Sequence, residues 1–251
     1  MERARVAGTD RVNLLEIPLD IVSNDQLEDR IFRLLNDGDS HQLVLLSLWD
    51  FIRARGRSNY AASIRSSSLI LTSSKMVAFG AKFLRSREIT RHMPFEFVIR
   101  LLSVLEKRRR SVYVIGGRPS ALQTATSNLR GSFPQLQIVG RCAGYFPVSH
   151  EENILVAIRK AAPSLILGGK GLPGKNKWMQ KHRKHFAAGL TYWCGSCIDV
   201  FSGKRKKTSR ELWAKGLDFL PELPRNPLRF LRGFVYLWYV LLLLYHKARK
   251  I

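Results

Sequence analysis

Val112-Tyr-Val-Ile-Gly-Gly-Arg-Pro119 is an apolar run that ends in two glycines and is followed by a helical pattern over residues 120–130. Glycines at the end of a strand let the backbone approach a ligand, and the N–H groups of the following helix favour a phosphate. Ser164-Leu-Ile-Leu-Gly-Gly-Lys-Gly-Leu-Pro173 is a second junction of this kind. Together they predict a nucleotide crevice at one edge of a sheet, while the alternative for each is a tight connection without a ligand.

Short apolar runs alternate with longer helical patterns, which is typical of βαβ units. The expected strands cover residues 43–48, 69–71, 111–115, 137–139, 164–167 and 190–193, and the expected helices cover residues 25–35, 95–108, 120–130 and 151–161. Ser23 and Asp25 are candidate caps of the first helix. The sequence therefore predicts an α/β fold, a Rossmann-like mainly parallel sheet flanked by helices.

The chain is strongly basic, with 42 Lys+Arg against 19 Asp+Glu and a net charge of +23. Such a charge imbalance indicates what kind of partner the protein binds and says little about its fold. The clusters Lys204-Arg-Lys-Lys207 and Lys107-Arg-Arg-Arg110 belong to no recognition helix, zinc finger or aromatic-bearing sheet motif, so no nucleic acid partner is expected. An anionic membrane surface and a phosphorylated substrate remain as the expected partners.

The basic residues concentrate late in the chain, and this divides it into two parts. Residues 1–203 form the expected Rossmann-like domain, and residues 204–251 form a basic appendage that ends in an apolar, aromatic-rich run over residues 233–245. The run is shorter than the roughly 20 residues of a membrane span. Flanking cations suit the headgroup boundary, so we expect a membrane-binding appendage. The alternative is a buried C-terminal core helix.

The remaining composition points to a protein of the cytoplasm. The polar start of the chain has no apolar segment typical of a signal peptide. Cys142, Cys194 and Cys197 fit a reducing compartment, and the C-x-x-C pair lacks a second ligand pair, so no metal is expected. The histidines that we expect at the surface are His92, His150, His182, His185 and His246.

Further motifs follow one another in a fixed order over residues 12–232. They are Ile17-Pro-Leu-Asp-Ile-Val-Ser-Asn-Asp-Gln-Leu27, the junction at residues 112–119, Gly144-Tyr145-Phe146, Gly171-Leu-Pro173 with Trp178, Asp199-Val-Phe-Ser-Gly203, Ala214-Lys-Gly-Leu-Asp-Phe-Leu220, and Pro227 with Arg229 and Arg232. In order and spacing this series resembles the WecG/TagA/CpsF family of bacterial glycosyltransferases.

The resemblance implies an inverting glycosyltransferase that acts at the cytoplasmic face of the inner membrane as a peripheral protein. It would move a sugar, an N-acetylhexosamine or a hexose, from a UDP-sugar to a polyprenyl-diphosphate-linked acceptor in cell-surface polysaccharide synthesis, with no cofactor and no essential metal. Members often form oligomers, so a homo-oligomer is a further expectation.

The resemblance also implies a set of substrate-binding residues. Two arginines, Arg229 and Arg232, are expected near the lipid diphosphate or the leaving group, with electrostatic adhesion to lipid as the alternative. The others are Gly116, Gly117, Arg118, Pro119, Gly144, Tyr145, Phe146, Gly171, Pro173 and Asp199.

Three departures from the family pattern concern the catalytic base. Ser73 stands where the family has the aspartate of a Pro-Asp-Gly segment, and a hydroxyl does not accept a proton as a carboxylate does. Leu46-Ser-Leu-Trp-Asp50 replaces a Thr-x-Asn-Pro-Glu strand end, and Gly174-Lys175-Asn176 replaces Lys-Gln-Glu.

Two interpretations follow from these departures. In the first, the chain transfers a sugar with another carboxylate as the base, either Glu96 or Asp50, with Arg91 close to the sugar; the alternative for Glu96 is a solvated carboxylate at a helix start. In the second, the chain is a degenerate member that binds a membrane-linked intermediate or a partner enzyme without catalysis.

Overall fold

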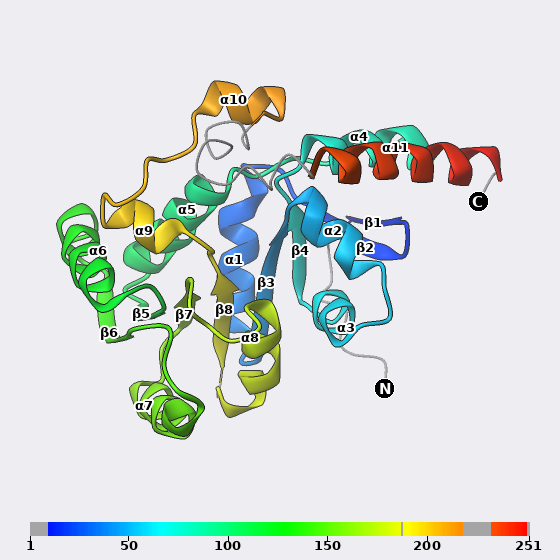
Figure 1. The fold of residues 1–251 in the computed structure, drawn as a ribbon. Helices are drawn as coiled ribbons and strands as arrows, with labels where there is room; N and C mark the ends of the chain where they lie inside the picture. Colours follow the sequence, from blue (N-terminus) through cyan, green and yellow to red (C-terminus); the bar gives the residue numbers. More distant parts are fainter. Residues whose placement is uncertain (1–9, 187, 218–231, 250–251) are drawn as a thin grey trace.

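A six-stranded sheet forms the centre of the protein, seen here in a computed structural model that describes residues 10–186, 188–217 and 232–249 (Figure 1). Its order is β4-β3-β8-β7-β5-β6, and all neighbouring strands are parallel. The strands are β3 (Ser40–Leu46), β4 (Leu69–Thr72), β5 (Ser111–Ile115), β6 (Gln137–Cys142), β7 (Leu165–Gly168) and β8 (Gly189–Trp193). The predicted α/β fold with a mainly parallel sheet is confirmed.

The strands are continuous apolar runs because helices cover both faces of the sheet. One face packs against α1 (Gln26–Asn36), α5 (Pro94–Lys107), α6 (Pro119–Ser132) and α9 (Cys197–Phe201). The other packs against α2 (Leu48–Ala54), α3 (Asn59–Arg65), α7 (Glu151–Ala161) and α8 (Asn176–His182). Ser23 Oγ accepts from the Gln26 backbone N–H (3.3 Å), which makes Ser23 rather than Asp25 the side-chain cap of α1.

Strand β3 begins three residues earlier than the sequence predicts, because the polar His41 and Gln42 are buried with hydrogen-bond partners. The imidazole of His41 lies 2.8 Å from Ser68 Oγ and 2.7 Å from Asp37 Oδ1. Gln42 Nε2 donates to the Asn176 carbonyl at 3.0 Å. Polarity alone placed these residues outside the strand, whereas their hydrogen bonds allow them to extend it.

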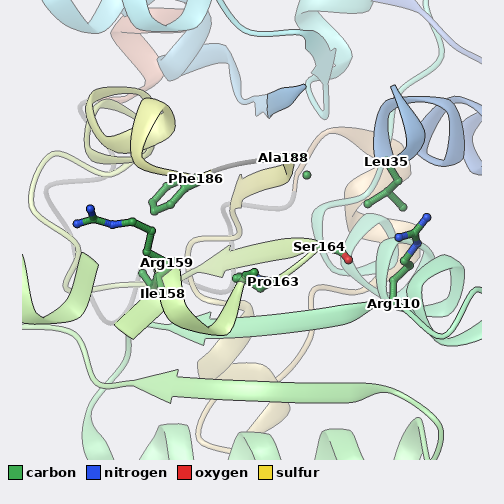
Figure 2. A pocket seen from close by; sticks show the side chains of 10 residues that line it. Leu35, Arg110, Ile158, Arg159, Pro163, Ser164, Phe186 and Ala188 are labelled. Carbon is green, nitrogen blue, oxygen red and sulfur yellow. The ribbon is translucent and has the colours of Figure 1, made fainter. Parts of the chain in front are cut away.

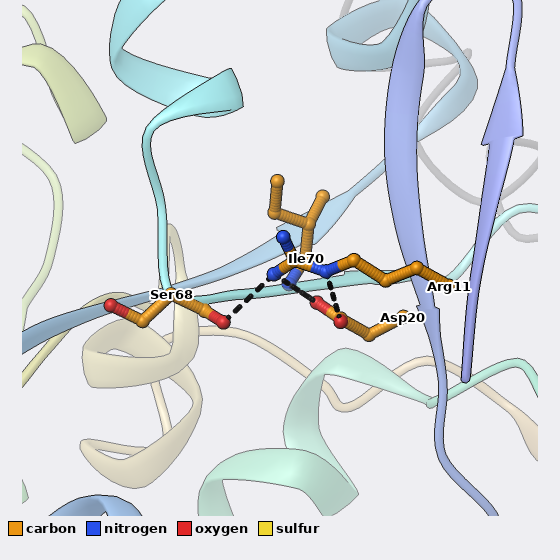
Figure 3. A network of polar contacts seen from close by, with 4 residues as sticks. All are labelled: Arg11, Asp20, Ser68 and Ile70. Atoms are coloured by element: carbon orange, nitrogen blue, oxygen red, sulfur yellow. Dashed lines mark hydrogen bonds and ion pairs between the residues drawn. The ribbon is translucent and has the colours of Figure 1, made fainter. Parts of the chain in front are cut away.

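A hairpin of β1 (Asp10–Leu14) and β2 (Ile17–Ile21) lies beside β4. The family resemblance implies an opening strand and helix within residues 17–27, where β2 lies, whereas β1 has no counterpart among the predicted strands. Arg11 Nε donates to Asp20 Oδ1 at 2.6 Å, and Arg11 Nη2 donates to Oδ2 at 3.2 Å (Figure 3). Asp20 Oδ2 also accepts from the Ile70 N–H at 2.7 Å. The Asp20 side chain is fully buried, so this carboxylate joins the hairpin to the sheet.

The last helix, α11 (Arg232–Ala248), packs against α2 and α4 (Lys75–Arg85) (Figure 1). Tyr239 and Leu243 are buried there, and Tyr239 meets the Phe51 ring edge-on with 5.9 Å between centroids. The opposite side of the helix exposes large apolar side chains, namely Phe234, Leu237, Trp238, Leu241, Leu244 and Tyr245. The helix is therefore partly docked on the domain and partly uncovered.

Replacing Gly80 with Ala should disturb the docking of α11. The added Cβ would lie 2.0 Å from Tyr239 Oη, and such overpacking costs about 1–3 kcal/mol. Helix propensity alone would favour Ala by about 1 kcal/mol, so a net loss of stability on chemical denaturation diagnoses the clash.

Tyr239→Phe is the control for this prediction. The Tyr239 hydroxyl is buried and has no hydrogen-bond partner in the described part of the chain, so its removal should not destabilise the protein. A Gly80→Ala variant as stable as the wild type, with α11 equally protected from proteolysis, would show that α11 does not dock as described.

Two of the histidines expected at the surface are buried, His92 and His182. His92 follows the bridge between Thr72 and Arg91 and lies beneath α5, where its Nε2 is 3.1 Å from the Val22 carbonyl oxygen. Burial lowers the pKa of His92 to about 4. No periodic apolar pattern surrounds His92 in the sequence, so sequence reasoning could not predict its burial.

The buried His92 should make the protein less stable in mild acid. Below pH 6.5 the unfolded chain protonates this imidazole while the folded chain does not, so stability falls until the pH reaches about 4. The loss attributable to His92 is roughly 3 kcal/mol over this interval. Urea unfolding at several pH values should show a shallower acid dependence for His92→Gln than for the wild type. An unchanged dependence would contradict the assignment.

Candidate functional site

All six strands of the sheet end at the same edge, which carries most of the residues that the sequence selects. In open α/β sheets this carboxyl edge is where ligands bind. The loops after β5, β6 and β7 carry the three glycine motifs, and the ends of β3 and β4 carry Asp50 and Ser73. The site predicted from the sequence is therefore spread along one edge.

The glycine-rich loops pack directly against one another. A Cβ on Gly116 would lie 2.7 Å from the Gly169 nitrogen, and one on Gly144 would lie 2.5 Å from the Lys170 oxygen. The Gly117 N–H donates to the Lys170 carbonyl at 2.7 Å. The close packing of the loops therefore requires glycine at these positions, whether or not a ligand binds there.

The loop after β6 is fixed to the loop after β7. The Tyr145 N–H donates to the Gly171 carbonyl at 3.0 Å, and a Cβ on Gly171 would lie 2.7 Å from the Tyr145 nitrogen. Tyr145 is exposed, while Phe146 packs against Trp178 with ring centroids 6.4 Å apart. Pro173 lies in the same β7 loop, just before α8. The exposed ring of Tyr145 is the part of this motif that a ligand can reach.

Positive charge gathers around the start of α6, which has Pro119 in its first turn and Arg118 as its N-cap. Lys204 Nζ donates to Ser120 Oγ at 2.8 Å. Lys170 pairs with Asp199 at 2.6 Å, so Asp199 joins α9 to the β7 loop. A long helix whose N-terminus lies among cations suits a phosphate.

Asp50 belongs to a polar network at the end of β3. Ser47 Oγ donates to Asp50 Oδ2 at 2.6 Å, and the Tyr60 hydroxyl donates to Oδ1 at 3.0 Å. Burial first, and then the Asp50 carboxylate, raise the pKa of Tyr60 above its ordinary value, so the phenol stays a donor. The Ser73 N–H donates to the Leu46 carbonyl at 3.0 Å, one residue before Ser47. Asp50 is thereby placed next to the end of β4, where Ser73 replaces the carboxylate expected from the family.

Arg91 and Glu96 both contact α10 (Arg210–Lys215). Arg91 Nη2 donates to the Trp213 carbonyl at 2.9 Å, and its guanidinium lies 4.1 Å from the centroid of the Trp213 ring. Glu96, in the first turn of α5, pairs with Arg210. These two predicted site residues therefore come together on α10, and neither makes a hydrogen bond to Asp50 among the described contacts.

The two arginines expected near the diphosphate have no described side chains. Arg229 lies outside the described residues, and Arg232 is described only as the backbone at which α11 begins. Cys194 and Cys197 are buried free thiols. In the ranges that the structure describes, no three His, Cys, Asp or Glu side chains come together as a metal site would require.

A cavity of about 230 Å³ lies at the opposite, amino edge of the sheet (Figure 2). Its apolar lining includes Leu35, Ile158 and Phe186, and Arg110 and Arg159 stand at its two ends. None of the predicted site residues lines it. The cavity therefore belongs to a different part of the molecule from the motifs.

Sequence reasoning missed Ser47, Tyr60, Trp213 and Arg210 as members of this edge. Ser47-Leu-Trp-Asp50 does read as a capping box, which is a local signal for a helix start after β3. The contacts of Trp213 with Arg91 join residues far apart in the sequence, and no local pattern announces them.

Comparison with known proteins identifies the family. Residues 12–251 match the sequence model described as the glycosyl transferase WecG/TagA/CpsF family. An N-acetylglucosaminyldiphosphoundecaprenol N-acetyl-beta-D-mannosaminyltransferase of Bacillus subtilis (strain 168) is 24% identical over 194 residues, which cover 76% of this chain and 74% of that protein. A protein of the same name from Bacillus spizizenii (strain ATCC 23059 / NRRL B-14472 / W23) is 23% identical over 188 residues, covering 75% and 72%. Because the match spans nearly the whole chain, the protein belongs to the WecG/TagA/CpsF family and is a glycosyltransferase.

Proposed function

We propose that this glycosyltransferase moves an N-acetylhexosamine or a hexose from a UDP-sugar to a polyprenyl-diphosphate-linked sugar, with inversion at the anomeric carbon. The names of the two Bacillus relatives support an undecaprenyl-diphosphate-linked N-acetylglucosamine as the class of acceptor and an N-acetylated mannosamine as the class of sugar transferred. The product class is a lipid-linked precursor of a cell-surface polysaccharide.

Asp50 is the proposed base, and the main support for the proposal is the position of its carboxylate. It would take the proton of the acceptor hydroxyl while that oxygen bonds to the anomeric carbon of the donor sugar. The bond from this carbon to the diphosphate breaks, and UDP leaves with the electron pair. Asp50 stands beside Ser73 and is oriented by Ser47 and Tyr60, whereas the Glu96 carboxylate is paired with Arg210. This network supports catalysis over the degenerate alternative.

Cations would stabilise the diphosphate that departs. Arg118 and Lys204 lie at the start of α6, where the N–H groups of the helix add to their charge. Arg229 and Arg232 are proposed for the lipid diphosphate or the leaving group, as the family resemblance implies.

A panel of UDP-sugars tests the substrate class. We expect UDP release from one N-acetylhexosamine or hexose donor, and only when a short-chain lipid-diphosphate sugar is also present. The same sugars linked to a nucleoside diphosphate of another base should give no release of the nucleotide. Release from none of the donors, by a folded protein that still binds vesicles, would favour the degenerate member instead.

The uncovered side of α11 is the proposed membrane contact, at the cytoplasmic face of the inner membrane. No helix within the described ranges combines the length and hydropathy that crossing a bilayer requires. Leu237 and Trp238 are more than half exposed, and Lys247 and Arg249 follow at the end of the helix. Apolar and aromatic side chains with neighbouring cations suit the boundary of an anionic bilayer.

Glutamates on this side of α11 should release the protein from vesicles. We expect Leu237→Glu/Leu241→Glu to lower partitioning onto vesicles of anionic phospholipid by about tenfold or more, because both apolar contacts are lost and two like charges face the lipid. Co-sedimentation measures the bound fraction.

Val139→Glu is the matched control, because Val139 is a half-exposed apolar residue on β6, at the far edge of the sheet from α11. Binding of the wild type should also persist at about 0.5 M salt, where attraction between exposed charges is screened. Insertion of α11 would be contradicted if both variants lost vesicle binding equally, or if salt abolished the binding of the wild type.

A further inference from the structure

Arg53 is an exposed cation on the same helix as the proposed base. It follows Asp50 by three residues in α2, so the two side chains are neighbours along the helix surface. Its guanidinium lies 4.5 Å from the centroid of the Tyr60 ring, and the hydroxyl of that ring donates to Asp50 Oδ1 at 3.0 Å. Tyr60 therefore contacts both the proposed base and this arginine, and fixes their relative position.

The N–H groups of Arg53 are available to a ligand. Two hydroxyl donors already occupy the oxygens of the Asp50 carboxylate, and no ion pair or hydrogen bond of Arg53 is found among the residues that the structure describes. A guanidinium stacked on an aromatic ring keeps the edge that carries its N–H donors free. The surface here is open to solvent, since Arg53 is exposed and Trp49, next to Asp50, is 43% exposed.

Helix α2 packs against α11, the helix that is proposed to contact the membrane (Figure 1). The ring of Phe51, which lies between Asp50 and Arg53 in the sequence, meets Tyr239 of α11 edge-on with 5.9 Å between centroids. A lipid-linked acceptor keeps its chain in the bilayer, so its head group approaches from the side of α11. The diphosphate of the donor, by contrast, is proposed to bind at the start of α6. The acceptor is therefore the substrate that Arg53 is placed to meet.

We propose that Arg53 binds a phosphate of the polyprenyl-diphosphate-linked acceptor and so places the acceptor sugar with its hydroxyl at Asp50. This inference rests on the proposed function, because it names the residue that recognises one substrate of that reaction. Side chains three residues apart on a helix have about 5–6 Å between their Cβ atoms, a span that one sugar ring can bridge. A guanidinium binds two phosphate oxygens at once, which orients the acceptor as well as holding it.

Steady-state kinetics of Arg53→Gln test this assignment. With a short-chain lipid-diphosphate N-acetylglucosamine, we expect KM for the acceptor to rise about 10-fold or more, while kcat and KM for the UDP-sugar stay within about twofold of the wild type. Arg53→Lys keeps the charge but not the paired donors, so it should recover only part of the affinity. Arg130→Gln is the matched control, because it removes the same charge from an exposed position in the last turn of α6.

Tyr60→Phe separates recognition of the acceptor from catalysis. The variant keeps the ring beneath Arg53 but loses the donor to Asp50, so it should lower kcat and leave KM for the acceptor unchanged. This is the opposite of the pattern expected for Arg53→Gln. Equilibrium binding of the labelled acceptor, measured without a UDP-sugar, should show the same loss of affinity in Arg53→Gln and does not depend on turnover.

An Arg53→Gln variant with unchanged affinity and KM for the acceptor, or an equal change in Arg130→Gln, would overturn the inference. Turnover by the wild type would in that case leave the proposed function standing. A wild-type protein that neither binds nor converts the acceptor would overturn both. If Arg53→Gln fails to fold, Arg53→Lys decides in its place, and a KM for the acceptor equal to that of the wild type would overturn the inference.

Discussion

Asp50→Asn should lower kcat by about 10²- to 10⁴-fold, the range that a general base contributes. The amide has nearly the shape of the carboxylate: its oxygen can still accept from Tyr60, and its NH2 can donate to Ser47 Oγ once that hydroxyl turns, so the start of α2 should keep its geometry. What it loses is the ability to take a proton. KM for the donor should change little, because the substitution removes none of the proposed contacts of the diphosphate.

Two companion variants separate Asp50 from the other candidate base. Glu96→Gln breaks an ion pair with Arg210 but removes no proposed proton acceptor. Because such partly exposed ion pairs contribute little, we expect kcat to fall only a few-fold. Tyr60→Phe removes one donor that orients Asp50 and should give a loss of about 3- to 10-fold in kcat. A Glu96→Gln variant that is inactive while Asp50→Asn remains active would transfer the role of base to Glu96.

Arg11→Met should lower the free energy of unfolding by about 3–5 kcal/mol, the cost of leaving a buried charge without its partner. Asp20 has a fully buried side chain, and Arg11 contacts both of its oxygens. The Asp20 carboxylate also accepts from the Ile70 N–H of β4. Loss of the Arg11 partner should therefore weaken the contact between the hairpin and the sheet as well. Urea denaturation of each variant measures the loss.

The double variant Arg11→Met/Asp20→Asn is the control. The neutral amide can still accept from Ile70 but leaves no buried charge, so it should recover much of the stability lost in Arg11→Met alone. Arg11 itself is 40% exposed, so we expect a loss at the lower end of this range. A cost below about 1 kcal/mol for Arg11→Met would mean that the pair behaves as a surface salt bridge.

The sheet could be predicted from the sequence wherever a strand is a buried apolar run with a glycine junction after it. β5 was predicted with its observed bounds, and β7 lies within one residue of its prediction. The pairing of β1 with β2 was not predicted, because the turn between them is made by Leu15 and Glu16, which have positive φ angles of 49° and 69° without any glycine. A turn of this kind has no sequence signal.

The candidate site was predictable only where its residues form local motifs. The glycine loops were located correctly in the sequence, and the structure adds that contact between loops also requires their glycines. Tyr60 and Trp213 were not predicted, because their roles depend on partners that only the tertiary fold brings near. Asp50 was selected through the family resemblance, and the structure adds the donors that orient it.

Turnover by the wild-type protein is the most direct test of the central claim, which is that this chain transfers a sugar although Ser73 replaces the expected base. Purified protein on anionic vesicles would receive a UDP-sugar and a short-chain lipid-diphosphate N-acetylglucosamine, and mass spectrometry would follow the lipid. We expect a product heavier by one sugar residue, with an inverted anomeric configuration, that Asp50→Asn does not form. Unchanged acceptor from a folded, vesicle-bound wild-type protein, with every donor of the panel, would contradict the account.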